Sequence, residues 1–130
     1  QLNLPVKIFV FNNEELSFIA MEMKASGYLD YATDFVNPDF GKLAEAAGIK
    51  GVSITNSSEV DEKIMEALNH NGPVIVNVRV DKQELAMPPK IAYQQAKGFS
   101  KYLINAILDG RGTELKEMAK TNWMKYKSLY

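Results

Sequence analysis

The chain has no cysteine and only one histidine among its 130 residues. The absence of cysteine excludes disulfide bonds and thiolate metal sites, and it is compatible with a reducing compartment. The histidine, His70, lies in a polar turn with no acid or nucleophile placed to use it, so we expect a surface residue. The sequence also lacks a nucleophile-elbow serine and a glycine-rich phosphate loop.

Long apolar runs and a large excess of one charge are absent as well. No stretch approaches the roughly 18–20 apolar residues that span a bilayer. The start at Gln1 has neither the basic nor the apolar segment of a signal peptide, and a formal net charge of -1 gives no reason to expect nucleic acid as a partner. Because the chain does not begin with Met, we expect a piece of a longer protein.

The residues that are present are typical of a globular domain, with 46% apolar and 24% charged side chains. Three short apolar runs, at residues 6–11, 51–55 and 74–80, predict buried strands. Because helical patterns separate these runs, we expect an α/β fold with a parallel sheet. Three strands are few for such a sheet, so we expect partner strands to be missing or supplied by another chain.

Helical periodicity predicts a first helix over residues 15–26, with Gly27 at the position of a helix stop. Two further helices are predicted beyond Pro88-Pro89, over residues 90–109 and 113–127. In the first helix, the stripe that we expect to be buried consists of Leu16, Ile19, Ala20 and Met23.

Two helix starts carry capping signals. Asn37 precedes Pro38 and Asp39, an order that indicates an N-cap, a proline at the first helical position and an acidic first turn. Ser58 and Asp61 have the spacing of a capping box in front of another helical pattern.

A candidate ligand site follows the first predicted strand, where Asn12 and Asn13 precede a helix. Ligands of open α/β sheets bind at the carboxyl ends of strands, against the start of the next helix. An Asn side-chain oxygen and the backbone carbonyl of Glu15 are oxygen ligands of the kind that Mg²⁺ prefers. An Asn pair also fits an ordinary strand end and helix cap, and spacing alone leaves both interpretations open.

Phe18 and Glu22 lie four residues apart and therefore share one face of the first predicted helix. A Glu near such a metal site could donate or accept a proton if burial raised its pKa. The alternative interpretation is a solvated Glu beside a packed Phe.

Six ordered segments, which together extend over almost the whole chain, resemble thiamine-diphosphate-dependent pyruvate oxidases that pass electrons from flavin to a membrane quinone. The first segment resembles the end of the thiamine-diphosphate motif, which begins with Gly-Asp-Gly and finishes with Asn-Asn. The last three segments are the most similar to the quinone-linked oxidases. The segments are residues 4–13 (LPVKIFVFNN), 18–24 (FIAMEMK), 72–74 (GPV), 84–89 (ELAMPP), 95–100 (QAKGFS) and 119–123 (AKTNW).

The resemblance implies a cofactor site at Asn12, Asn13 and Glu15. Asn13 would give its side-chain oxygen to Mg²⁺, and Glu15 would give its main-chain carbonyl oxygen, so that the metal holds the diphosphate of the cofactor. Ser17 departs from the pattern, since relatives often have glycine there. The two acids Glu14 and Glu15 beside the metal position are a second departure, which could weaken binding.

The resemblance also implies catalytic positions and a reaction. Phe18 and Ile19 would line the thiazolium and the adduct formed from pyruvate, and Glu22 would handle protons around that adduct. The implied reaction is the oxidative decarboxylation of pyruvate with thiamine diphosphate, Mg²⁺ and FAD, in which electrons pass to quinone or oxygen.

The resemblance divides the chain into residues 1–87, the C-terminal part of a thiamine-diphosphate-binding domain, and residues 88–130, a C-terminal helical extension. The Gly-Asp-Gly aspartate, the Glu that activates the aminopyrimidine and the FAD domain would all lie outside this chain. We therefore expect the chain alone neither to bind thiamine diphosphate tightly nor to decarboxylate pyruvate. For the parent protein, the resemblance implies a cytoplasmic homotetramer.

The C-terminal tail, residues 111–130, carries five basic and two acidic side chains. A basic amphipathic helix with an interfacial Trp can lie on anionic lipid, so peripheral attachment to the cytoplasmic membrane is one interpretation. Packing on its own domain or on a neighbouring subunit is the other. The apolar side of the tail would consist of Leu115, Met118, Ala119, Trp123, Met124 and Tyr126.

Two other functions stay open. The chain could come from another thiamine-diphosphate enzyme, such as an acetolactate synthase or a 2-keto acid decarboxylase. It could also be a non-catalytic module for membrane docking or protein interaction, which the uneven charge of the tail alone would favour.

Overall fold

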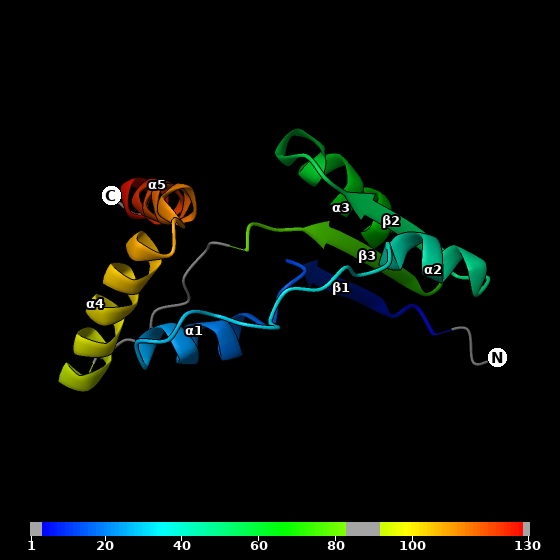
Figure 1. Cartoon of the computed structure of the whole chain (residues 1–130). Helices are drawn as coiled ribbons and strands as arrows, with labels where there is room; N and C mark the ends of the chain where they lie inside the picture. Colours follow the sequence, from blue (N-terminus) through cyan, green and yellow to red (C-terminus); the bar gives the residue numbers. More distant parts are fainter. Residues whose placement is uncertain (1–3, 83–91, 129–130) are drawn as a thin grey trace. The chain divides into compact units, whose positions relative to one another are not determined.

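The computed structural model describes residues 4–82 and 92–128. It contains a parallel sheet of β1 (Lys7–Asn12), β2 (Lys50–Ile54) and β3 (Val74–Arg79), in the order β1-β3-β2 (Figure 1). The predicted α/β fold with a parallel sheet is confirmed, and each strand end lies within one residue of the predicted one. Because β3 is the central strand, its residues form rows with both neighbours, as Asn77 does with Val10 and Ser53.

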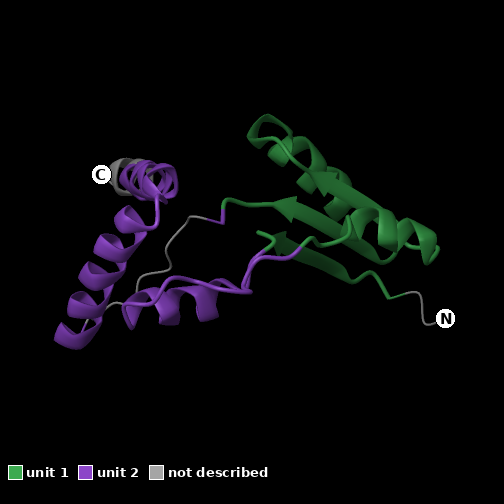
Figure 2. Cartoon of the chain, in the orientation of Figure 1, with its two compact units in different colours: residues 1–14, 36–81 green, residues 15–35, 82–130 purple. Residues whose placement is uncertain are grey.

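The chain forms two compact units that alternate along the sequence (Figure 2). Residues 1–14 and 36–81 form unit 1, which contains the sheet, and residues 15–35 and 82–130 form unit 2, which is helical. The boundary predicted between residues 87 and 88 lies outside the described residues, as does the 84–89 segment, so that division stays a prediction. Nothing in the sequence pattern indicated that the first helix groups with the last ones.

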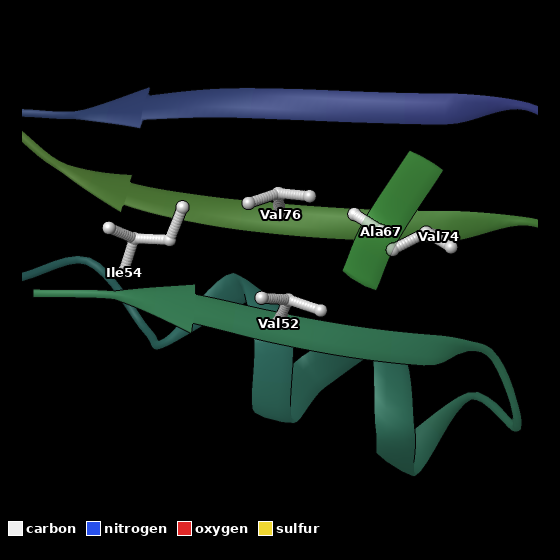
Figure 3. Close-up of a cluster of buried hydrophobic side chains, with 5 residues drawn as sticks. All are labelled: Val52, Ile54, Ala67, Val74 and Val76. Atoms are coloured by element: carbon white, nitrogen blue, oxygen red, sulfur yellow. The ribbon is translucent and has the colours of Figure 1, made fainter. Parts of the chain in front are cut away.

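The core of unit 1 lies between the sheet and α3 (Val60–Asn69). Valines 74 and 76 of β3 alternate with residues of the opposite face, as expected for a pleated strand. Figure 3 shows them on the same side of the sheet as Val52, Ile54 and Ala67, the residue that α3 contributes. These five side chains are at most 5% exposed, and they hold α3 on this face.

The other face of β2 packs against α2 (Phe40–Ala46) through two glycines. A Cβ on Gly51 would lie 1.9 Å from the carbonyl oxygen of Gly41, so only glycine at residue 51 allows this approach. Ser53, two residues on, points to the same face because side chains alternate along a strand. The close packing brings the start of α2 beside the carboxyl end of the sheet.

Both predicted helix caps in unit 1 are wrong. The N-cap of α2 is Asp39, whose side chain accepts hydrogen bonds from the backbone N–H groups of Gly41 and Lys42, whereas Asn37 lies outside the helix. The helix α3 follows a short 3₁₀ turn, η1 (Ser57–Glu59), and has no side-chain cap. The polar residues before each helix indicated its start correctly, but tertiary contacts made Asp39 the cap of α2, and α3 has none.

Unit 2 consists of α1 (Ser17–Ala25), α4 (Tyr93–Leu108) and α5 (Gly112–Ser128), with the connecting segment that follows α1. The predicted helix stop is confirmed, since Gly27 has a φ of 85°, a left-handed conformation that glycine adopts without strain. The apolar core of the unit consists of buried Tyr102, Ala106 and Met118, against which Leu29, Phe99, Leu103 and Leu115 pack.

The stripe predicted to be buried in α1 is partly wrong. Ala20 is buried, but Leu16 and Ile19 are 45% and 49% exposed. The second buried residue of α1 is Lys24, which is only 4% exposed. Within the described parts of the chain, no helix is long and apolar enough to cross a membrane.

Candidate functional site

The residues predicted for the site divide between the two units. Unit 1 contains the end of β1 and the residues that follow it, whereas α1 and the residue before its N-cap belong to unit 2. The members in unit 1 are Asn12 and Asn13, and those in unit 2 are Glu15, Phe18, Ile19 and Glu22.

Asn12, the last residue of β1, is 3% exposed and lies at the centre of a hydrogen-bond network. Its side-chain nitrogen donates to Oδ1 of Asn77 at 3.2 Å. Its Oδ1 accepts hydrogen bonds from Nδ2 of Asn37 at 2.8 Å and from the backbone N–H of Glu14 at 3.3 Å. A buried amide that is satisfied on both sides fixes the strand end, the turn after it and the segment before α2 in one arrangement.

The network continues from Asn77 to Asp39. Nδ2 of Asn77 donates to Oδ1 of Asp39 at 3.4 Å, and the hydroxyl of Ser53 donates to the same oxygen at 2.6 Å. The Ser53 hydrogen bond is the main reason that the pKa of Asp39 is lowered, and the backbone N–H groups of the helix start lower it further. Asp39 is therefore held as a carboxylate that ties α2 to β2 and β3.

Glu14 and Arg79 form a two-point ion pair directly after the end of β1. The two guanidinium nitrogens of Arg79 lie 2.7 and 2.6 Å from the two carboxylate oxygens of Glu14, the fork geometry that gives strong orientation. Glu14 has a φ of 56°, in the left-handed region that residues other than glycine seldom adopt. Of the two acids that follow Asn13, Glu14 is thus neutralised by Arg79.

Asn13 lies between these two fixed residues and is partly buried. Its amide oxygen is a neutral, hard oxygen of the kind that suits Mg²⁺ and not a soft metal, and the backbone carbonyl predicted as a second ligand, that of Glu15, belongs to unit 2. In the described residues, no group of three or more His, Asp or Glu could hold a metal ion. The chemistry of the Asn13 amide oxygen fits one ligand of Mg²⁺, and a full octahedron needs further oxygens.

The predicted catalytic residues all lie on α1 and face solvent in this chain. Phe18 is 75% exposed and Ile19 is 49% exposed, which is unusual for two large apolar residues on one helix. Glu22 is exposed as well, so this chain by itself does not bury its carboxylate. His70 is exposed as expected, and its carbonyl oxygen accepts a hydrogen bond from Lys7.

The side chain of Glu15 lies in a polar cavity of unit 2 with a volume of about 220 Å³. Five acidic side chains line this cavity together with Lys82 and Arg111. Burial is the main cause that raises the pKa of Glu15, and the nearby Lys24 opposes it. The metal-ligand role implied for Glu15 uses its backbone carbonyl oxygen. That role does not depend on where the Glu15 side chain lies.

Sequence reasoning missed the buried charge cluster of unit 2, which centres on Lys24. Its ammonium lies 3.5 Å from Glu114, 3.9 Å from Asp30 and 5.6 Å from the ring centroid of Tyr102. Arg111 joins the cluster through Asp30 at 3.2 Å. A lysine four residues after Ala20 on the buried side of a helix was the available signal, because a charge there needs partners.

Comparison with known proteins gives a consistent family. Residues 1–78 match the family described as thiamine pyrophosphate enzyme, C-terminal TPP binding domain. YdaP of Bacillus subtilis, named as a thiamine pyrophosphate-containing protein, is 36% identical over 118 residues, which cover 91% of this chain and 20% of that protein.

Acetolactate synthases are also similar. The mitochondrial catalytic subunit of Saccharomyces cerevisiae is 39% identical over 89 residues, covering 68% of this chain and 13% of the subunit. The isozyme 2 large subunit of Escherichia coli is 32% identical over 87 residues, covering 65% of this chain and 16% of the subunit. The chain thus spans a fifth or less of the length of these curated relatives.

Proposed function

The chain belongs to the thiamine pyrophosphate enzymes, with residues 1–78 as their C-terminal TPP-binding domain, and from this premise we propose that the parent protein is a flavin-dependent pyruvate oxidase. It would oxidatively decarboxylate pyruvate with thiamine diphosphate, Mg²⁺ and FAD, and pass electrons to quinone or oxygen. This chain would supply part of the cofactor site and one helix of the substrate site.

The observation that carries the proposal is how much of the chain the relatives match. The similarity to YdaP covers 91% of the chain and therefore includes residues of the C-terminal helices. The similarity to the yeast acetolactate synthase covers 68% of the chain. In the C-terminal helices α4 and α5, residues 95–100 and 119–123 are the segments that resemble the quinone-linked oxidases.

Each proposed residue would act through a group that the fold makes available. The Asn13 side chain and the Glu15 carbonyl would hold Mg²⁺, which would grip the diphosphate. Thiamine diphosphate, when bound, supplies the carbanion chemistry that cleaves the bond between the carboxyl and keto carbons of pyruvate. Exposed Phe18 and Ile19 would cover the reacting end of the substrate and exclude water from it.

Glu22 would hold and move a proton at its carboxylate, near the reacting carbon. It is exposed here and would be shielded by parts of the enzyme outside this chain. A Glu22→Gln enzyme should therefore bind thiamine diphosphate normally and lose turnover by about 10²-fold or more, the usual contribution of a positioned acid or base.

Acetolactate synthase is the second candidate, and the named synthases among the relatives favour it. It differs in the fate of the two-carbon unit, which joins a second keto acid and is not oxidised. A decarboxylase would release an aldehyde.

The test uses the purified full-length parent, given pyruvate without oxygen. Bleaching of its flavin together with acetate formation would support the oxidase. Acetolactate or acetaldehyde formed with an unbleached flavin would contradict it. The 130-residue chain alone, assayed in parallel, should give no turnover.

A further inference from the structure

We propose that Asn12 and the Glu14–Arg79 ion pair are positioning groups that hold Asn13 in the orientation in which it binds Mg²⁺, an inference that rests on the proposed function. All four residues belong to unit 1, as do the partners of Asn12. The argument is that Asn13 is joined on each side to a residue whose conformation is fixed.

The residue before Asn13 is fixed by three hydrogen bonds of its side chain. Asn12 binds Asn77 on β3 and Asn37 on the segment before α2, and it accepts from the backbone of Glu14. Its carbonyl oxygen also accepts a hydrogen bond from Val80 at 3.1 Å. The sheet thus fixes the position of the backbone immediately before Asn13. The hydrogen bond from the Glu14 N–H to Oδ1 of Asn12 closes a turn whose central residue is Asn13.

The residue after Asn13 is fixed by the ion pair. Glu14 has a left-handed φ of 56°, which costs free energy in a residue other than glycine and persists only where surrounding contacts impose it. The two hydrogen bonds from Arg79 are such contacts. Arg79 lies directly opposite Asn12 in the sheet. The turn therefore begins at Asn12 and ends at Glu14, which is bound to the residue paired with Asn12.

Neither positioning group is suited to bind the metal itself. The side chain of Asn12 is 3% exposed, and both its oxygen and its nitrogen have protein partners. Both carboxylate oxygens of Glu14 are bound to Arg79. Their effect on Mg²⁺ would come through the orientation of the ligand between them, as in other sites where partners of a ligand set its geometry.

Substitution of Arg79 distinguishes a role in orienting Asn13 from an effect of the Arg79 charge alone. Removing a positive charge near a cation site should tighten Mg²⁺ binding if Arg79 acts only by its charge. If Arg79 acts by holding the turn, its removal should weaken binding. The two explanations predict changes of opposite sign.

The experiment measures Mg²⁺ binding to the full-length parent by titration calorimetry, with thiamine diphosphate at saturation. For Arg79→Gln we expect affinity to fall about tenfold or more, the loss typical of groups that orient metal ligands. Arg79→Lys keeps the charge without the fork and should also bind more weakly. Asn12→Ala, which removes both the donor to Asn77 and the acceptor of Asn37, should behave in the same way.

Glu66→Gln is the matched control, because Glu66 forms an exposed 2.6 Å ion pair with Lys50 at the first residue of β2. It should leave Mg²⁺ affinity unchanged. Unchanged or tighter binding by Arg79→Gln would overturn the inference, and Arg79→Lys with wild-type affinity would do so even if the Gln variant failed to fold. Failure of the unsubstituted parent to bind Mg²⁺ and thiamine diphosphate would instead refute the proposed function.

Discussion

Gly98 of α4 lies against the backbone of α1, since a Cβ on Gly98 would stand 1.9 Å from the carbonyl oxygen of Ala25. This approach joins the helix that carries the predicted catalytic residues to the first of the C-terminal helices. Asn105, two turns further along α4, donates to the carbonyl oxygen of Gly27 at 3.2 Å. Two residues of α4, Gly98 and Asn105, thus contact the C-terminal end of α1 and the glycine that follows it.

Substituting Gly98 by Ala should destabilise unit 2. Alanine ordinarily stabilises a helix relative to glycine by up to about 1 kcal/mol, but here the methyl group meets backbone that cannot rotate away. We expect a net loss of about 1–3 kcal/mol, as for overpacked cores, seen as a lower thermal midpoint of the parent protein. Gly112→Ala, with no atom near the added Cβ, is the control and should be neutral or stabilising.

Replacing Lys24 by Met should cost more stability than replacing an exposed lysine. The change removes the ammonium group from beside Asp30 and Glu114, side chains that are 8% and 23% exposed and that keep Arg111 as a cationic partner. Leaving buried acceptors partly unsatisfied in this way costs about 1–3 kcal/mol. Lys50→Met, which breaks the exposed pair with Glu66, should lower the urea midpoint much less, because exposed ion pairs contribute little to stability. Equal losses in urea unfolding would contradict a structural role for the cluster.

Asp39 should stabilise unit 1 in a pH-dependent way. Its pKa is lowered in the folded protein, so its contribution is fully present above its ordinary value of 3.8 and is lost as the pH falls through the lowered pKa. Near neutral pH, Asp39→Ala should lose about 1 kcal/mol through the missing helix cap. Asp39→Asn keeps an acceptor oxygen and should lose less.

The advantage of the wild type over Asp39→Asn should then shrink below pH 3.8. Urea unfolding at neutral and acid pH measures this difference. A difference that stays constant across that range would mean that the carboxylate charge contributes nothing.

The tail is best tested for membrane binding with a single substitution. Met118 is 5% exposed in the core of unit 2, so deleting residues 111–130 would damage that core as well as any lipid-binding surface. Trp123 is 64% exposed, and Trp123→Ser should abolish flotation of the parent with anionic liposomes if the tail lies on lipid. Tyr93→Ser, at an 82% exposed aromatic residue of α4, should leave flotation unchanged. Flotation that survives Trp123→Ser would favour the alternative of protein packing.

The sequence was sufficient to predict the sheet and the order of its elements, because apolar runs and helical periods depend on local pattern. It was insufficient for the helix caps. Asn37 and Asp39 are both good capping residues, and the choice between them depends on Ser53 and Asn12, which lie far away in the chain. Local propensity cannot distinguish two such candidates when tertiary hydrogen bonds decide.

The candidate site was predictable only in part for a related reason. Asn12 and Asn13 were visible as a polar pair after a strand, but Arg79 belongs to another strand, and only the parallel register brings it opposite Asn12. The burial of Lys24 was likewise hidden, since its acidic partner Glu114 comes from α5. Contacts between distant segments require the topology before they can be inferred.

The alternation of the two units along the chain has a consequence for how the protein is made. Unit 1 is complete once Asp81 has been synthesised, whereas α1 of unit 2 must wait for α4, which starts at Tyr93. That delay is roughly 70 residues, or on the order of several seconds at a ribosomal rate of about 5–20 residues per second. During this interval α1 has been synthesised, and the helix that contacts it through Gly98 has not. Within this chain, the helix proposed to carry the catalytic residues therefore acquires its native neighbours after the sheet of unit 1 is complete.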